Sequence, residues 1–167
     1  MNIFTLDSCP KKSAELQHDK HVVKMILESA QILCSVFDKD KFNVPYRRTH
    51  YNHPCNKWAR ESYGNFSWLL SHAFSLSDEY TYRFGKRHKS KDVLNWCWEH
   101  KGYLKLNKQS KTNFAQAMPI EYKQENSIDA YKDYYINEKL NDRTKWTNRN
   151  VPSIFKEKME LIKQESV

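Results

Sequence analysis

A histidine, a lysine and a glutamate stand in register in the segment 17–31, QHDKHVVKMILESAQ. The apolar residues of this region recur at helical spacing and predict a buried stripe made of Val22, Met25, Ile26, Ser29, Leu33 and Val36. A second face of the same helix carries Gln17, His21, Lys24, Glu28 and Gln31. His21 and Glu28 are two turns apart, roughly 10 Å along the axis, so one ligand could contact both.

The polar face has two interpretations. In the functional one, Glu28 acts as a general base or stabilises a cation, and His21 positions a phosphate or shares the proton transfer. Lys20 and Lys24 would then neutralise phosphates. In the structural one, the face is solvated and holds one Lys24–Glu28 pair worth about 0.3 kcal/mol.

A basic segment, residues 47–55, begins with Arg47 and Arg48 and also contains His50, His53 and Cys55. The last three side chains could ligate zinc together with a fourth ligand from elsewhere, but their spacing matches no standard zinc motif. The alternative is local capping of a helix, with the two histidines near a phosphate or lining a pocket. We favour this alternative and expect no metal site.

Two further segments could contact nucleic acid. Cations and aromatic rings alternate along residues 80–98, where Lys86 and His88 would bind phosphate and Trp98 would stack on a base. Equally, the cations could form a solvated helix end and the tryptophans could lie in the core. In the apolar connector 114–119, FAQAMP, Gln116 could read a base edge, but an amide at such a place more often satisfies the loop backbone.

Composition narrows the class of protein. A net charge of +8 favours a polyanionic partner, nucleic acid above all, with a generically basic protein as the alternative. Only three glycines are present, which argues against Rossmann, P-loop and turn-rich β folds, and 14% aromatic residues predict an aromatic core. Four scattered cysteines, no signal peptide and no membrane-spanning run indicate a cytoplasmic protein.

These features predict a mainly α, compact single-domain helical fold over residues 1–167, with irregular basic loops. Residues 1–7 would form an N-terminal arm and residues 163–167 a frayed tail. We expect the helices to span residues 10–37, 52–85, 92–100 and 127–139, with a last one from residue 151 onward.

The triplet Asp19-Lys20-His21 followed by Glu28 resembles the catalytic helix of the phage pyrimidine-dimer DNA glycosylases of the endonuclease V type. In that family an Asp-Gln-His triplet precedes the catalytic Glu, with the same seven-residue interval from the His. A second similarity is His53 followed by an aromatic-rich helix that ends in Arg-Phe-Gly at residues 83–85. A C-terminal part rich in tyrosine and tryptophan is a third.

The resemblance implies a compact helical fold that flips a nucleotide out of duplex DNA, attacks the sugar C1′ with an N-terminal α-amine and then cleaves the strand by a lyase step. It assigns Glu28 as the catalytic carboxylate and His21 as a phosphate contact. In the family the amine belongs to a Thr exposed by removal of the initiator Met. Here Asn2 is larger than the side chains that the processing enzyme accepts, so we expect Met1 to stay and to supply the amine, or a Glu28-activated water to act instead.

Leu27 and Gln31 stand where the family has arginines. Phosphate binding must therefore be rebuilt from other side chains, and the substrate need not be a pyrimidine dimer.

We predict a DNA N-glycosylase, with or without abasic-site lyase activity, that acts on a damaged or modified base. The predicted catalytic residues are Glu28, His21, Lys24 and Met1, and the predicted nucleic-acid contacts are Lys20, Arg47, Arg48, Arg60, Arg83, Lys86 and His88. No cofactor is required, DNA is the partner, and we expect a monomer of phage or viral origin. Two alternatives stay open: a glycosidase or hydrolase acting on a free nucleotide or modified nucleoside, and a non-catalytic nucleic-acid-binding protein.

Overall fold

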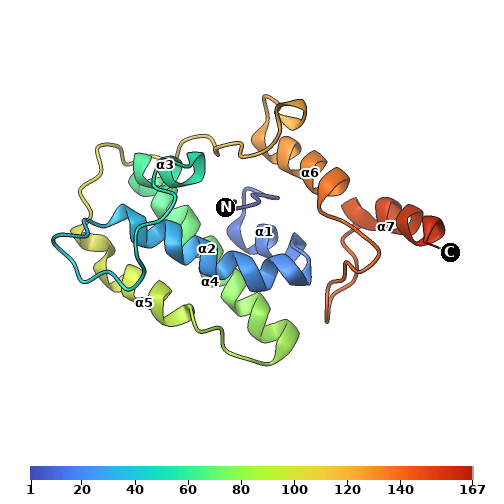
Figure 1. The fold of residues 1–167 in the computed structure, drawn as a ribbon, viewed down its shortest axis with the longest axis horizontal. Coiled ribbons are helices and arrows are strands. Elements are labelled where there is room, and N and C mark those ends of the chain that lie inside the picture. The colour runs from blue at the N-terminus through green and yellow to red at the C-terminus, as the bar shows by residue number, and fades with distance from the viewer. Residues whose placement is uncertain (167) are drawn as a thin grey trace.

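The computed structural model describes residues 1–166, which contain seven α-helices and no β-strand (Figure 1). The two longest helices, α2 (Asp19–Val36) and α4 (Tyr63–Phe84), pack against each other at the centre. The short helix α1 (Pro10–Leu16) packs on α4, and α3 (Pro54–Glu61) packs on both long helices. The prediction of a mainly α fold is confirmed.

The remaining helices lie at the two ends of this central pair. Helix α5 (Lys91–His100) contacts α2 and α4 and continues into the 3-10 helix η1 (Lys101–Tyr103). An extended connector leads to the 3-10 helix η2 (Ile120–Tyr122), then to α6 (Ser127–Glu138) and α7 (Ser153–Glu165) at the opposite end in Figure 1. None of the helices in residues 1–166 combines the length and the apolar character that crossing a membrane requires.

Aromatic side chains fill much of the core, as their abundance predicts. Tyr131, Tyr135, Phe37, Phe66 and Phe155 are the largest fully buried side chains. The predicted stripe of α2 is also buried, apart from its half-buried last member, Val36. Burying large rings compensates for the modest apolar content of the chain, because each ring removes much area from water.

The helix expected over residues 10–37 is interrupted. Gln17 and His18 are extended, so α1 ends at Leu16 and α2 begins at Asp19. No glycine or proline marks this break. Instead, the free carbonyls at the end of α1 accept hydrogen bonds from distant side chains: Trp146 binds Leu16 O at 2.9 Å, and Arg83 binds Gln17 O at 2.8 Å.

The helix expected over residues 52–85 is also divided, at Ser62. Ser62 has extended dihedrals, and its hydroxyl accepts from Asn65 N at 3.0 Å, so it caps α4. The chain from residues 108 to 112 crosses here, and Gly64 N donates to Gln109 O at 2.8 Å. A Cβ on Gly64 would lie 2.4 Å from the backbone nitrogen of Lys111, so only glycine permits this crossing.

The other helix ends lie within two residues of the predicted ones. Helix α4 ends as expected at Gly85, whose φ of 67° is the left-handed conformation typical of a helix C-cap. Helix α7 continues to Glu165, so residues 163–165 of the expected tail are helical. Residue 167, the last of the expected tail, lies outside the described residues.

Candidate functional site

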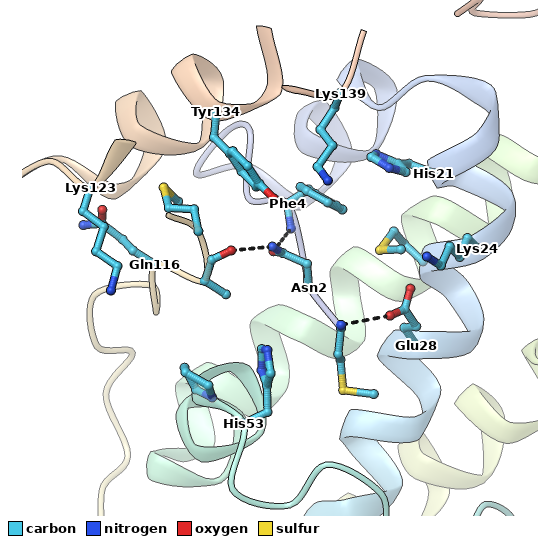
Figure 2. Close-up of a pocket in the computed structure, with 15 residues that line it drawn as sticks. Asn2, Phe4, His21, Lys24, Glu28, His53, Gln116, Lys123, Tyr134 and Lys139 are labelled. Carbon is cyan, nitrogen blue, oxygen red and sulfur yellow. Dashed lines mark hydrogen bonds and ion pairs between the residues drawn. The ribbon is translucent and has the colours of Figure 1, made fainter. Parts of the chain in front are cut away.

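The first six residues form an irregular arm that lies inside the protein between α2, α3 and the connector that leads to α6 (Figure 2). Asn2, only 8% exposed, fixes its shape. The Asn2 amide donates to Ala117 O at 2.7 Å, and its Oδ1 accepts from Ile3 N at 2.7 Å and from Phe4 N at 3.1 Å. Phe4 takes a left-handed backbone conformation, with φ of 57°. This turn directs the chain start toward α2.

The α-amine of Met1 forms an ion pair with Glu28 of α2, at 3.6 Å from Oε1. The Met1 side chain is 3% exposed, and its sulfur accepts from Asn56 Nδ2 at 3.4 Å, which anchors the residue on α3. The other oxygen of Glu28, Oε2, is buried and has no hydrogen-bond partner within residues 1–166. A carboxylate oxygen that water does not reach is costly to leave unpaired.

A pocket of about 440 Å³ surrounds this pair. Its walls come from the arm, α2, the start of α3, the connector and α6 (Figure 2). Among the described residues that line it, Glu28 is the one carboxylate, whereas Lys24, Lys123 and Lys139 bring three cations. The volume and the positive rim suit a single nucleotide with its phosphates.

His21 lies in the wall of this pocket, about two turns before Glu28 on α2. Its ring belongs to a column of stacked rings. Its imidazole stacks on Phe4, with ring centroids 4.4 Å apart, and on His18, with centroids 4.1 Å apart. Tyr135 Oη accepts from His18 N at 3.0 Å, so its own proton is free to be donated to His21 Nδ1, 2.9 Å away.

Burial, with added repulsion from His18 and Lys139, lowers the pKa of His21 to about 2. The ring is therefore uncharged at neutral pH. It can offer a neutral N–H from Nε2, whereas the charge that a phosphate contact needs is carried by the lysines.

The connector forms the wall opposite α2, and α6 holds it in place. Tyr131 Oη donates to Ala115 O at 2.5 Å and accepts from Ala117 N at 3.1 Å. Gln116 lines the pocket, but both ends of its amide bind the backbone of Gln124, at 2.6 and 3.0 Å. Of the two roles weighed for Gln116, the structure shows the satisfied loop amide.

The predicted DNA contacts fall into separate groups. Arg48, on the loop that Asn56 ties to Met1, and Arg60, in the last turn of α3, lie on the ring of exposed Tyr51, 4.1 and 3.7 Å from its centroid. Arg47 is exposed on the same loop and lines a second cavity, of about 510 Å³. Lys20 is exposed on the first turn of α2.

Arg83, expected to contact phosphate, is instead 3% exposed. Its guanidinium pairs with Asp19 at 3.2 Å and with Glu79 at 2.9 Å, and it also binds the backbone where α1 meets α2. Burial opposes ionisation of Glu79, but hydrogen bonds from Arg149 and the charge of Arg83 outweigh it and lower the pKa of this carboxyl. Arg83 therefore anchors the start of α2, and its guanidinium presents no surface to DNA.

The remaining two predicted contacts lie beyond α4, away from the lining of the pocket. Lys86 is exposed, directly after the C-cap of α4. His88 is half-buried, with Nε2 3.2 Å from Val23 O and Nδ1 accepting from Ser90 N at 3.1 Å. Burial lowers the pKa of His88, so this ring also carries a neutral N–H.

No cluster of three metal-ligating side chains exists within residues 1–166. Of the residues weighed as zinc ligands, Cys55 is buried in the first turn of α3, and burial raises the pKa of its thiol to about 12. His53 uses Nδ1 to accept from Cys55 N and so caps α3. The capping interpretation of this segment is the one that the structure shows, with His53 as the cap.

Several pocket residues were not expected from the sequence. The sequence drew attention to Asn2 only because its size prevents removal of the initiator Met. Tyr134, Lys123 and Lys139 were not predicted to belong to the site, although all three line the pocket. The last three join the site only because α6 folds back over the arm (Figure 2). No spacing along the chain signals this contact across more than a hundred residues.

Comparison with known proteins adds one finding. The model of a family described as pyrimidine dimer DNA glycosylase matches residues 1–93, more than half of the 167-residue chain. No curated protein and no solved structure matches the chain.

Proposed function

The chain belongs to the pyrimidine dimer DNA glycosylase family, and we propose that it excises a damaged or modified base from DNA with the Met1 α-amine as nucleophile and Glu28 as its base. The observation that carries this proposal is the 3.6 Å pair between the amine and Glu28, set in a pocket that one nucleotide would fill. An amine and a carboxylate are sufficient for this chemistry, so we propose no cofactor.

The first step would be displacement of the base. Glu28 takes a proton from the Met1 ammonium, and the freed electron pair forms a bond to C1′ of a flipped-out nucleotide. The bond between C1′ and the base nitrogen breaks, and its electron pair leaves with the base. The Glu28 carboxylate, which lines the pocket, would stabilise the cationic character that develops on the sugar, where a largely buried carboxylate has most effect.

A lyase step would follow from the same covalent adduct. As the sugar ring opens, the proton that Glu28 holds passes to O4′ and the nitrogen loses a proton to water, which gives an iminium between C1′ and the Met1 nitrogen. The Glu28 carboxylate restored in this way then takes a C2′ proton, and the electrons of that C–H bond expel the 3′ phosphate. Glu28 is the carboxylate within reach of the adduct, so we assign it this proton transfer as well.

The cations around the pocket would hold the DNA backbone. Lys24, Lys123 and Lys139 line the pocket, Arg48 lies on the loop next to the arm, and Arg60 lies in the last turn of α3. Each phosphate that they neutralise releases counterions, so binding should weaken steeply with salt.

Borohydride trapping tests the proposal. The purified protein is incubated with duplexes that carry a thymine dimer or an abasic site, reduced, and digested with trypsin. We expect an adduct on the N-terminal peptide, residues 1–11, and not on a peptide that carries Lys24, Lys123 or Lys139. Glu28→Gln keeps the shape of the side chain but not its basicity, and we expect it to lower the rate by 100-fold or more, that is, by about 3 kcal/mol of barrier.

The controls separate the alternatives. Lys24→Gln removes a neighbouring amine and should leave the adduct on residues 1–11. Intact mass spectrometry shows whether Met1 is retained. An adduct on a lysine would refute the role of Met1. Cleavage of a free nucleoside without any adduct on duplex DNA would favour the hydrolase alternative, and salt-sensitive DNA binding without cleavage would favour the binding protein.

A further inference from the structure

His53 presents a fixed, uncharged N–H group to the pocket. The ring occupies the N-cap of α3, and Nδ1 accepts a hydrogen bond from Cys55 N at 3.1 Å. Because an amide N–H can only donate, Nδ1 carries no proton, and the proton of the neutral ring is on Nε2. A protonated ring would place a hydrogen on Nδ1 and break the cap.

The surroundings of the ring favour the same state. His53 is half-buried in the pocket lining, on the side that faces the arm (Figure 2). Burial, the Met1 ammonium and His50 all lower its pKa. Within residues 1–166 its Nε2 has no hydrogen-bond partner, so the N–H is free for a ligand.

The proposed reaction needs such a group. When the bond from C1′ to the base breaks, the departing base keeps the electron pair, and much of that charge resides on its carbonyl oxygen. The amides of Asn2 and Gln116, which could also donate, are engaged by Ala117 O and Gln124 O. The N–H of His53 is an uncharged donor beside the arm that no group of residues 1–166 engages.

We propose that His53 Nε2–H donates a hydrogen bond to the carbonyl oxygen of the departing base and stabilises the charge that forms there. This inference rests on the proposed function and concerns base departure alone. His53 keeps its proton throughout, since its Nδ1 is held by Cys55 N, and the base anion takes its own proton from water. The later lyase step involves no base, so it does not use His53.

Two substitutions separate the role of Nε2 in chemistry from the role of Nδ1 in capping. His53→Asn keeps an acceptor at the position of Nδ1, and Asn is a favourable N-cap, but it lacks the N–H at the position of Nε2. His53→Gln has the converse properties, because its longer amide can place an N–H near Nε2 while the cap acceptor is lost. Each variant is assayed on a thymine-dimer duplex and on the same duplex with an abasic site.

We expect His53→Asn to lower kcat for dimer excision at least tenfold and to leave abasic-site cleavage and trapping within twofold of the unmodified protein. His53→Gln should recover most of the excision rate in spite of a lower Tm. The inference is overturned if His53→Asn excises at the normal rate, or if it loses both activities together, as a purely structural residue would. The inference fails alone if the unmodified protein excises the dimer and His53→Asn does so at the same rate. If the unmodified protein cleaves only abasic DNA, the excision step of the proposed function fails together with the inference, and if it reacts with neither duplex, the lyase step fails as well.

Discussion

Three histidines, His18, His21 and His72, are held in uncharged form inside the protein. Burial lowers their pKa values from 6.5 to about 4, about 2 and about 3, respectively. Above pH 6.5 each is neutral in both the folded and the unfolded chain and has no effect on stability. Below pH 6.5 the unfolded chain binds protons that the folded one does not, so stability falls with pH until the folded-state pKa is reached.

The magnitude follows from those values. Each histidine contributes a slope of about 1.4 kcal/mol per pH unit, which amounts to about 2 kcal/mol of lost stability between pH 7.5 and pH 5. The three together give about 6 kcal/mol, comparable with the whole stability of many domains of this size. His53 and His88, whose pKa values are also lowered, add in the same direction.

Urea denaturation at pH 7.5, 6 and 5 checks this reasoning. We expect the midpoint to fall steeply while the slope of free energy against urea stays constant. His72→Phe removes one of the three buried titrating rings, so it should reduce the pH dependence of stability by about a third. Phe is a suitable replacement because the His72 ring stacks on Trp68 and its Nδ1 has no partner within the described residues. His50→Asn, at an exposed position, is the matched control and should leave it unchanged. A midpoint that hardly moves between pH 7.5 and pH 5 would refute the claim that these rings are buried and neutral.

Three other outcomes follow from the packing and the charges. Arg83→Met should cost about 3–5 kcal/mol, because it leaves Asp19 with an unpaired buried charge, and calorimetry showing a loss below about 1 kcal/mol would contradict the anchoring role. Gly64→Ala should lower Tm by several degrees, whereas Gly102→Ala, where a Cβ meets nothing within 4 Å, should shift it little. Lys139→Gln should reduce the salt dependence of DNA binding by about one counterion, and an unchanged slope in a salt titration would place this lysine away from the phosphates.

Much of the helical architecture could be predicted from the sequence. Helices α4 to α7 end close to the predicted residues because the signals there are local, such as the left-handed Gly85 and the turn chemistry around Asn126. The break between α1 and α2 could not be predicted. The break is stabilised by hydrogen bonds from Trp146 and Arg83, which are 130 and 66 residues away along the chain. No property of residues 16–18 predicts these long-range hydrogen bonds.

The sequence predicted which residues of α2 share the candidate site, but not how the site is enclosed. The spacing of His21, Lys24 and Glu28 indicated one functional face, and the structure brings all three to one pocket with Met1. The ionic state of His21 was not predictable, because it depends on the stack with Phe4 and on the hydroxyl of Tyr135. Spacing reports which side chains share a face, but not how deeply other segments bury it.

The two halves of the pocket have different origins along the chain. The amine, Glu28 and His53 belong to residues 1–93, the part that the family model matches, whereas the facing wall comes from residues 116–139, outside that match. The two halves meet at the bond from Asn2 to Ala117 O. This division means that the Met1–Glu28 pair and the wall that faces it can diverge separately in evolution. A lineage could replace the C-terminal wall, and with it the shape of the pocket, without altering the ion pair, provided that a carbonyl remained to receive Asn2.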